Sequence, residues 1–438
     1  MSGRKVCPVV LCSGNVDVPQ VPSRVWLFHP VEPRRASGAQ VKCRAPLARR
    51  GFTSSKTAVL DSGAPLLLLW RSNKTREPTP GSNPPFRVDL GYGSQNPEAG
   101  SRPARRPTEP TALPACGPLS GMPLTLEQYA SYLDTRNLPW PAPPEIERPR
   151  AKPHLERLPG VRAILWNVYG TLLAVPGGEL YYEHPLKFVM DVALDKTIQE
   201  FKMWGSMSRK PGQPADYLRQ IYANLLDEQR TGGTEKHPEV AVDRLWEAFL
   251  KKLLQKEYRF DAGFYGSLNE FSRKVAYFFH ASLQSCICYP EAATALRQAA
   301  DNGLTQGLLA DGQCFTAVQL QRGLQWQDAS LHLDQVIDPN LRILSYELRT
   351  RKPSERLFRE ALQILAERGV TPEQVLHLGS RVQQDVVPAR RAGMRTGLFA
   401  GDRASLQATP EQLKEPASRP DVLLTELSQV AEVVSGEW

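Results

Sequence analysis

The sequence has no long apolar run, which limits what the chain can do at a membrane. Its longest apolar stretch, Pro65–Trp70, is far shorter than the roughly 20 residues that span a bilayer. Near the N-terminus, Pro8 interrupts a short apolar region and no clear cleavage site follows, which argues against a signal peptide. We therefore expect no transmembrane helix, no membrane partner and a cytoplasmic location.

Cysteine is also scarce. The seven cysteine residues are odd in number and scattered, so we expect no disulfide framework. Only Cys286 and Cys288 form a close pair, and no second Cys or His pair follows at the spacing of zinc ligands. This pattern favours partly buried thiols over a zinc site.

Positive charge is concentrated in residues 1–121. This segment holds 17 Lys+Arg and 7 Asp+Glu, a net charge of +10, whereas the whole chain carries +8, so the remainder carries −2. The basic excess therefore does not indicate a nucleic-acid surface on the folded part, and we expect no nucleic-acid partner.

The same segment has 17 of the 38 prolines and no sustained apolar periodicity, which predicts a disordered, basic, Pro- and Gly-rich tail. Three interpretations stay open: sequence upstream of the true start that is not translated, a disordered arm, or a basic binding arm. Residues 122–160 are predicted to form a lead-in, with a short helix over Thr125–Leu133 and a Pro-rich connector over Pro139–Pro153.

A buried strand followed by a tight turn is predicted at Val161–Leu173. Residues 163–166 are apolar without a break, as in a strand that is covered on both faces, and Gly170-Thr171 provides the turn. Catalytic groups of open α/β sheets lie at the carboxyl ends of such strands.

The pattern becomes helical over residues 176–285. Apolar residues recur at helical spacing through 242–254, and further helices are predicted over Asp216–Glu228 and Ser267–Phe279. Helices and strands then alternate to the C-terminus. The strands are expected at Leu304–Ala310, Arg342–Leu348, Val375–Leu378, Thr396–Phe399 and Asp421–Leu424.

This order predicts an α/β fold with a doubly wound, Rossmann-like parallel sheet. The α/β core is expected to comprise residues 161–175 and 286–438. Residues 176–285 are expected to form an inserted α-helical cap domain.

The segment Asn167–Leu172, which reads N-V-Y-G-T-L, resembles the first motif of the haloacid dehalogenase (HAD) superfamily. In that family the strand ends in Asp-x-Asp-x-Thr or, in one subgroup, Asp-x-Tyr-Gly-Thr-Leu. The resemblance places Asn167 at the position of the catalytic nucleophile and Tyr169 at that of the acid/base. An amide cannot form the covalent intermediate that the family's carboxylate forms.

Three later segments resemble the remaining motifs in the family's order. The resemblance assigns phosphate binding to Ala310, where a hydroxyl is usual, to the adjacent Asp311, and to Lys352, which is intact. It assigns magnesium binding to Ser380, which replaces a carboxylate, and to Asp385, which is retained.

Neutral ligands are poor replacements for carboxylates on Mg²⁺, so we expect weak or lost metal binding and a magnesium cofactor only if the chain is active. A purely structural ion pair between Lys352 and Asp385 is an equally good interpretation of those two residues.

Three functional hypotheses follow. The first is a catalytically impaired HAD-like protein that binds a phosphorylated or other anionic small molecule in the cleft between cap and core. The second is an active hydrolase, phosphatase or dehalogenase-like, with an altered mechanism. The third is an interaction scaffold without a small ligand. The sequence indicates no oligomeric state.

Overall fold

The computed structural model describes residues 122–206 and 214–434, all of them within one compact unit, Arg105–Trp438. The tail predicted for residues 1–121 lies outside the described residues. Within the described ranges, no helix is long and apolar enough to cross a membrane.

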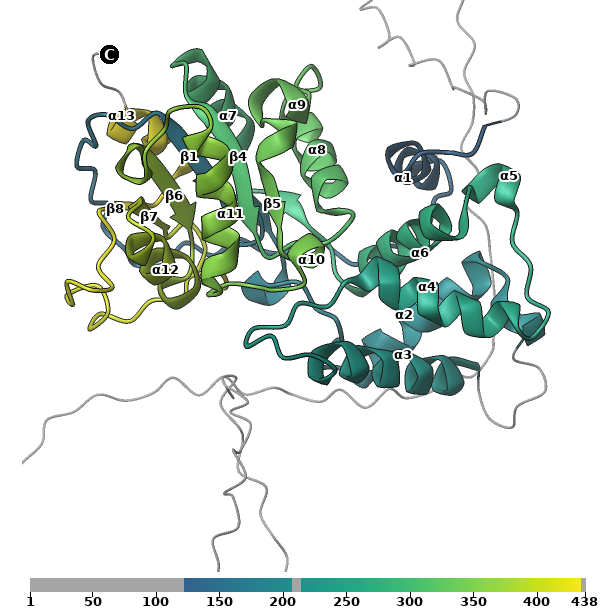
Figure 1. Cartoon of the computed structure of the whole chain (residues 1–438). Coiled ribbons are helices and arrows are strands. Elements are labelled where there is room, and N and C mark those ends of the chain that lie inside the picture. Colours follow the sequence, from purple (N-terminus) through teal and green to yellow (C-terminus); the bar gives the residue numbers. More distant parts are fainter. Residues whose placement is uncertain (1–121, 207–213, 435–438) are drawn as a thin grey trace, which may run out of the picture. The chain divides into compact units, whose positions relative to one another are not determined.

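A six-stranded sheet forms the centre of the α/β core (Figure 1). Its strands, in spatial order, are β5 (Arg342–Leu344), β4 (Thr305–Ala310), β1 (Ala163–Trp166), β6 (Val375–Gly379), β7 (Arg395–Phe399) and β8 (Val422–Leu424). All neighbouring strands are parallel. The doubly wound, Rossmann-like parallel sheet is confirmed.

Helices cover both faces of this sheet. On one face Ile164 and Trp166 pack in a cluster with α7 (Ala292–Asp301), α8 (Thr316–Gln327) and α13 (Val430–Val434). On the other face Ala163 and Leu165 pack with α11 (Glu355–Ala366) and α12 (Val387–Arg391). This double coverage explains why β1 is apolar at every position.

The strand expected over Arg342–Leu348 is too long. It ends at Leu344, and Ser345–Leu348 forms the single helical turn α10. Bonds from distant parts of the chain hold this turn: the Ser345 hydroxyl donates to Glu239 at 2.6 Å and accepts from Gly312 N at 2.9 Å. Arg349 then adopts a left-handed conformation with φ 57°.

The segment that connects β1 to β4 is mainly helical. Its main helices are α2 (Lys187–Glu200), α3 (Pro214–Thr231), α4 (Val242–Leu254) and α6 (Leu268–Leu283), with the short turn α5 (Ala262–Tyr265). Their apolar faces form an aromatic-rich core that also takes in α1 (Leu126–Asp134). The helices predicted over 242–254, 216–228 and 267–279 are present, and α2 was not predicted. The division into lead-in, core and cap domains stays a prediction.

A two-stranded antiparallel sheet marks where the chain leaves and re-enters the α/β core. Its strands are β2 (Leu173–Ala174) and β3 (Ile287–Cys288). Cys288 lies on the second strand and Cys286 just before it. Both are free thiols, and burial raises the pKa of Cys286 to about 12.

Candidate functional site

Asn167 lies at the carboxyl end of β1, and its side chain is fully hydrogen-bonded. Its Oδ1 accepts from Lys352 Nζ at 2.9 Å, and its Nδ2 donates to the Tyr169 carbonyl at 2.9 Å and to Thr171 Oγ1 at 3.4 Å. The residue is 1% exposed. The amide therefore links Lys352 to the turn after β1, and its nitrogen and oxygen both form hydrogen bonds within the protein.

The side chain of Lys352 is completely buried at the carboxyl ends of β1 and β4. Besides Asn167, its Nζ contacts the Asp385 carboxylate and the Leu309 carbonyl, the latter at 3.3 Å. Burial lowers the pKa of Lys352, and the charge of Asp385 acts in the opposite direction. Burial alone would raise the pKa of Asp385, but Lys352 and Arg381 hold it far below its usual range. The pair is therefore a buried salt bridge.

Asp385 can approach the end of β6 because the last residue of that strand, Gly379, has no side chain. At Gly379 a Cβ would collide with the Asp385 carboxylate. The Arg381 amide donates to Asp385 Oδ2 at 3.0 Å, which fixes the turn that starts the π-type segment Val382–Val386. The conformation of this turn positions Asp385 against Lys352.

Asp311, which follows β4, is held by two cations. Its Oδ1 accepts from the Lys352 amide at 2.8 Å, and its Oδ2 accepts from Arg381 Nη2 at 2.8 Å. Arg351 Nη2 lies 3.9 Å from the same oxygen. Burial alone would raise the pKa of Asp311, but these guanidinium groups keep it below its usual value.

Arg381 is a site residue that sequence reasoning missed. Its guanidinium, 4% exposed, also pairs with Glu179 at 3.3 Å, and its Nε lies 3.7 Å from Asp385. Arg351 approaches Glu179 at 3.6 Å. The only sequence signal was position, since Arg381 directly follows Ser380 in the fourth motif and Arg351 directly precedes Lys352.

The remaining predicted residues contribute differently. Ala310, at the end of β4, presents no polar side-chain atom. The Ser380 hydroxyl is buried without a hydrogen-bond partner in the described part of the chain; a Cβ on Gly170, whose φ is +82°, would lie 2.7 Å from it. Tyr169 directs its hydroxyl to α8, where it bonds Gln319 at 2.6 Å and Thr316 at 2.9 Å.

Tyr169 is poorly suited to proton transfer in this arrangement. Burial raises its pKa well above the usual value, and the bond with Thr316 offsets this only in part. A general acid works best with a pKa near the working pH. The phenol instead fixes the turn after β1 to α8.

The oxygen atoms that would surround Mg²⁺ do not form a metal site. The Asn167 oxygen accepts from an ammonium, the Tyr169 carbonyl accepts from the Asn167 amide, and Asp385 is paired with Lys352. Among the described residues, no cluster of three or more His, Cys, Asp or Glu could hold a metal. Mg²⁺ favours several oxygen ligands with negative charge, so the residues present do not fit it.

A cavity of about 20 Å³ remains beside these groups, lined by Asn167, Glu179, Asp311, Arg351 and Arg381 among others. That volume admits about one water molecule. The site is therefore closed in this conformation.

The segment 237–242 between α3 and α4 is pinned to the core beside this cavity. Gln313 donates to the Val240 carbonyl at 2.7 Å, and the Arg351 amide donates to the His237 carbonyl at 2.9 Å. The Glu239 carboxylate bonds Ser345 and the Tyr182 hydroxyl, and burial raises the pKa of Glu239. These bonds hold the helical segment against the carboxyl ends of the strands.

Comparisons with known proteins identify relatives of this arrangement. A family model described as HAD-hydrolase-like matches residues 349–430. A phosphoserine phosphatase of Thermus thermophilus is 32% identical over 166 residues, which are 38% of this chain and 58% of the relative. A glyceraldehyde 3-phosphate phosphatase of Pyrococcus furiosus is 29% identical over 150 residues, 34% of this chain and 55% of the relative. The chain thus spans a little more than half the length of these curated relatives.

Solved structures with a similar fold include a HAD phosphatase from Thermococcus onnurineus, at 18% identity and a TM-score of 0.36, covering 63% of this chain and 99% of that one. An L-2-haloacid dehalogenase from Xanthobacter autotrophicus has 18% identity and a TM-score of 0.32, covering 62% and 97%. The family match contains Lys352, Ser380 and Asp385. This match and the order of the parallel sheet indicate that the α/β core of this chain is that of the haloacid dehalogenase superfamily.

Proposed function

We propose that this protein is a catalytically impaired HAD-superfamily member that binds a phosphorylated or other anionic small molecule in the cleft between its helical segment and its core. The observation that carries the proposal is the position of Glu179. Its carboxylate faces two guanidinium groups at the edge of the small cavity.

The impairment follows from Asn167. Its amide nitrogen and oxygen are held by Tyr169 and Lys352, and an amide has no nucleophilic oxygen to accept a phosphoryl group. Removing a nucleophile from a catalytic unit costs on the order of a millionfold in turnover. Ala310 lacks the hydroxyl that would donate to a phosphate, so a second part of the machinery is absent.

The proposed anion site consists of the two guanidinium groups of Arg351 and Arg381. Arg351 and Arg381 share Asp311 and Glu179 as partners. Asp311 is fixed to the backbone of Lys352, whereas Glu179 lies just after the short turn Pro176–Gly178 and keeps 35% of its side chain exposed. Glu179 is therefore the anion that a ligand would displace, and the two guanidinium groups would then bind the ligand bidentately.

The relatives suggest the first class of ligand to test. Both are named for phosphate esters of small metabolites, and arginine pairs suit phosphate oxygens. Inorganic phosphate and a small sugar phosphate are thus suitable probes.

The test is calorimetric titration of phosphate into the wild type and the Glu179→Gln variant. Neutralising Glu179 removes the internal competitor, so the variant should bind phosphate about tenfold more tightly, which corresponds to roughly 1.4 kcal/mol. Arg351→Gln should weaken binding by a similar factor, because it removes one of the two guanidinium groups.

Glu183→Gln is the matched control, since Glu183 is a partly exposed carboxylate of the same segment that pairs with Arg230 instead. It should bind phosphate as the wild type does. If neither the wild type nor Glu179→Gln binds phosphate or a sugar phosphate, the proposal fails and the interaction-scaffold hypothesis gains support.

A further inference from the structure

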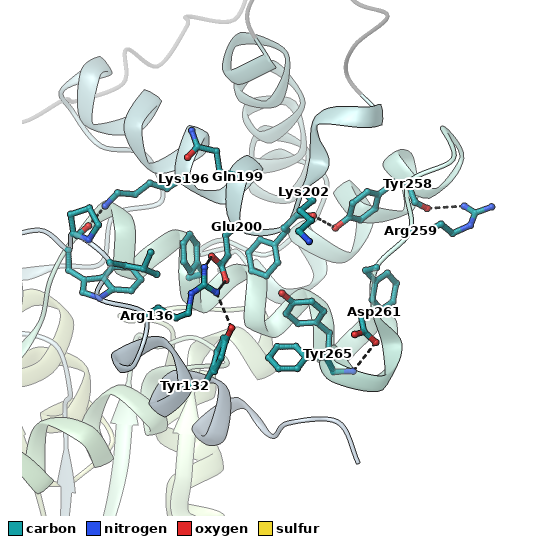
Figure 2. A pocket seen from close by; sticks show the side chains of 17 residues that line it. Tyr132, Arg136, Lys196, Gln199, Glu200, Lys202, Tyr258, Arg259, Asp261 and Tyr265 are labelled. Atoms are coloured by element: carbon teal, nitrogen blue, oxygen red, sulfur yellow. Dashed lines mark hydrogen bonds and ion pairs between the residues drawn. The ribbon is translucent and has the colours of Figure 1, made fainter. Parts of the chain in front are cut away.

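A second, larger pocket lies within the helical segment, apart from the cavity beside Asn167. Its volume is about 870 Å³ (Figure 2). Its walls come from three parts of the chain: residues between 132 and 140, at and just after the C-terminal end of α1; the C-terminal end of α2; and residues 258–265. This volume lies within the range of small-molecule sites in proteins.

Aromatic rings line much of this pocket. They include Trp140, Phe201, Tyr258, Phe260, Phe264 and Phe278. The Trp140 ring packs edge-on against Phe278 at 5.5 Å, and Phe201 packs in the same way against Phe278 at 5.5 Å. Flat apolar surfaces of this kind bind the faces of aromatic ligands.

The wall formed by α1 is fixed before any ligand arrives. Tyr129 is fully buried in the aromatic core of the helical segment. Arg136 holds Glu200 with two bonds of 3.1 and 3.2 Å, as Figure 2 shows. Arg322 of α8 binds both oxygens of Asp134 at 2.7 and 2.9 Å. Preorganised walls lower the cost of binding.

The pocket carries a net positive charge. Four cationic residues line it, Arg136, Lys196, Lys202 and Arg259, against the two acidic residues Glu200 and Asp261, which leaves a net of +2. Glu200 is committed to Arg136, and Asp261 caps α5 by accepting from Phe264 N at 3.1 Å.

Three of these cations have no acidic partner in the described part of the chain. Lys196 donates to the Pro139 carbonyl and lies 5.6 Å from the centre of the Trp140 ring, and burial lowers its pKa. Arg259 Nη1 bonds the Tyr258 carbonyl at 2.8 Å. Lys202 follows α2 with a left-handed φ of 52°, a conformation that usually favours glycine.

We propose that this pocket binds a small organic anion with an aromatic body. The ring would lie against Trp140 and its aromatic neighbours, and the anionic group would face Lys196, Lys202 and Arg259. The chain's own residues 1–121 are an unsuitable occupant because they carry a net charge of +10. The proposal is independent of the anion site beside Arg381.

The test is calorimetric titration of the full chain with naphthalene-2-carboxylate and with its neutral analogue naphthalene-2-methanol. The carboxylate should bind about tenfold more tightly than the alcohol, because only the carboxylate carries a negative charge that Lys196, Lys202 and Arg259 attract. The double variant Lys202→Glu/Arg259→Glu should lose this preference, and both positions are exposed enough to change without disturbing the core.

The double variant Lys414→Glu/Arg395→Glu makes the same charge change at exposed positions of the α/β core and should bind the carboxylate as the wild type does. Equal affinity for carboxylate and alcohol would overturn the proposal. So would an unchanged affinity in Lys202→Glu/Arg259→Glu, or no binding at millimolar probe.

Discussion

The amide of Asn167 determines which charges the lysine beside it contacts. A lysine that faced two carboxylates would share its charge between them, but here Lys352 Nζ meets two neutral oxygens, those of Asn167 and Leu309, and a single carboxylate, that of Asp385. Both charged side chains are fully buried. A buried pair of this kind is costly to break, whatever its net contribution to stability.

Lys352→Met should therefore destabilise the protein by about 3–5 kcal/mol, because Asp385 would be left as a buried charge without its principal partner. The double variant Lys352→Met/Asp385→Asn should recover much of that loss. Urea denaturation of the three proteins measures the difference. A double variant no more stable than the single one would show that Asp385 depends on Arg381 rather than on Lys352.

Only the site residues that belong to a sequence motif could be predicted. The motifs brought Asn167, Lys352 and Asp385 to one edge of a parallel sheet, because the carboxyl ends of parallel strands share an edge. The ion pair of Arg381 with Asp311 joins residues 70 positions apart through a long flexible side chain. No spacing rule encodes that contact, nor the position of Glu179.

Among the secondary-structure elements, those with a strong apolar period were the predictable ones. α4 spans Val242–Leu254 as its spacing indicates. α2 was missed because its apolar residues do not form one face: Phe188 is 76% exposed, and no side chain caps the N-terminus at Leu186. Contacts with α3 and α6 determine that helix instead.

One of these elements, α6, carries a pH-sensitive residue. His280 is 1% exposed, its ring nitrogens have no hydrogen-bond partner among the described residues, and its ring packs against Phe315 with centroids 5.0 Å apart. Burial lowers its pKa from 6.5 to about 3. The native state therefore keeps this imidazole neutral in mild acid, where the unfolded chain protonates it.

This residue should make the protein less stable as the pH falls from about 6.5 towards 3, because only the unfolded state then gains the proton. Between pH 7 and pH 5 the loss from His280 alone should be about 2 kcal/mol. Denaturation of wild type and His280→Phe at both pH values measures it. A pH dependence of His280→Phe identical to that of the wild type would contradict the prediction.

Across the whole molecule, the helical segment and the α/β core close over a site whose charges satisfy one another. Lys352 is paired with Asp385, and Arg381 with Asp311 and Glu179. The residues 237–242 are hydrogen-bonded to the core beside it. The HAD-like parallel sheet is thus retained, and an internal network of ion pairs and hydrogen bonds occupies the carboxyl ends of its strands.

The turnover of p-nitrophenyl phosphate by the purified full chain, with and without Mg²⁺, tests this account most directly. The account predicts a rate equal to the uncatalysed background in both conditions, because the neutral amide oxygen of Asn167 is a poor nucleophile and the surrounding oxygens do not fit the metal. A magnesium-dependent turnover that Asn167→Ala abolishes would contradict it.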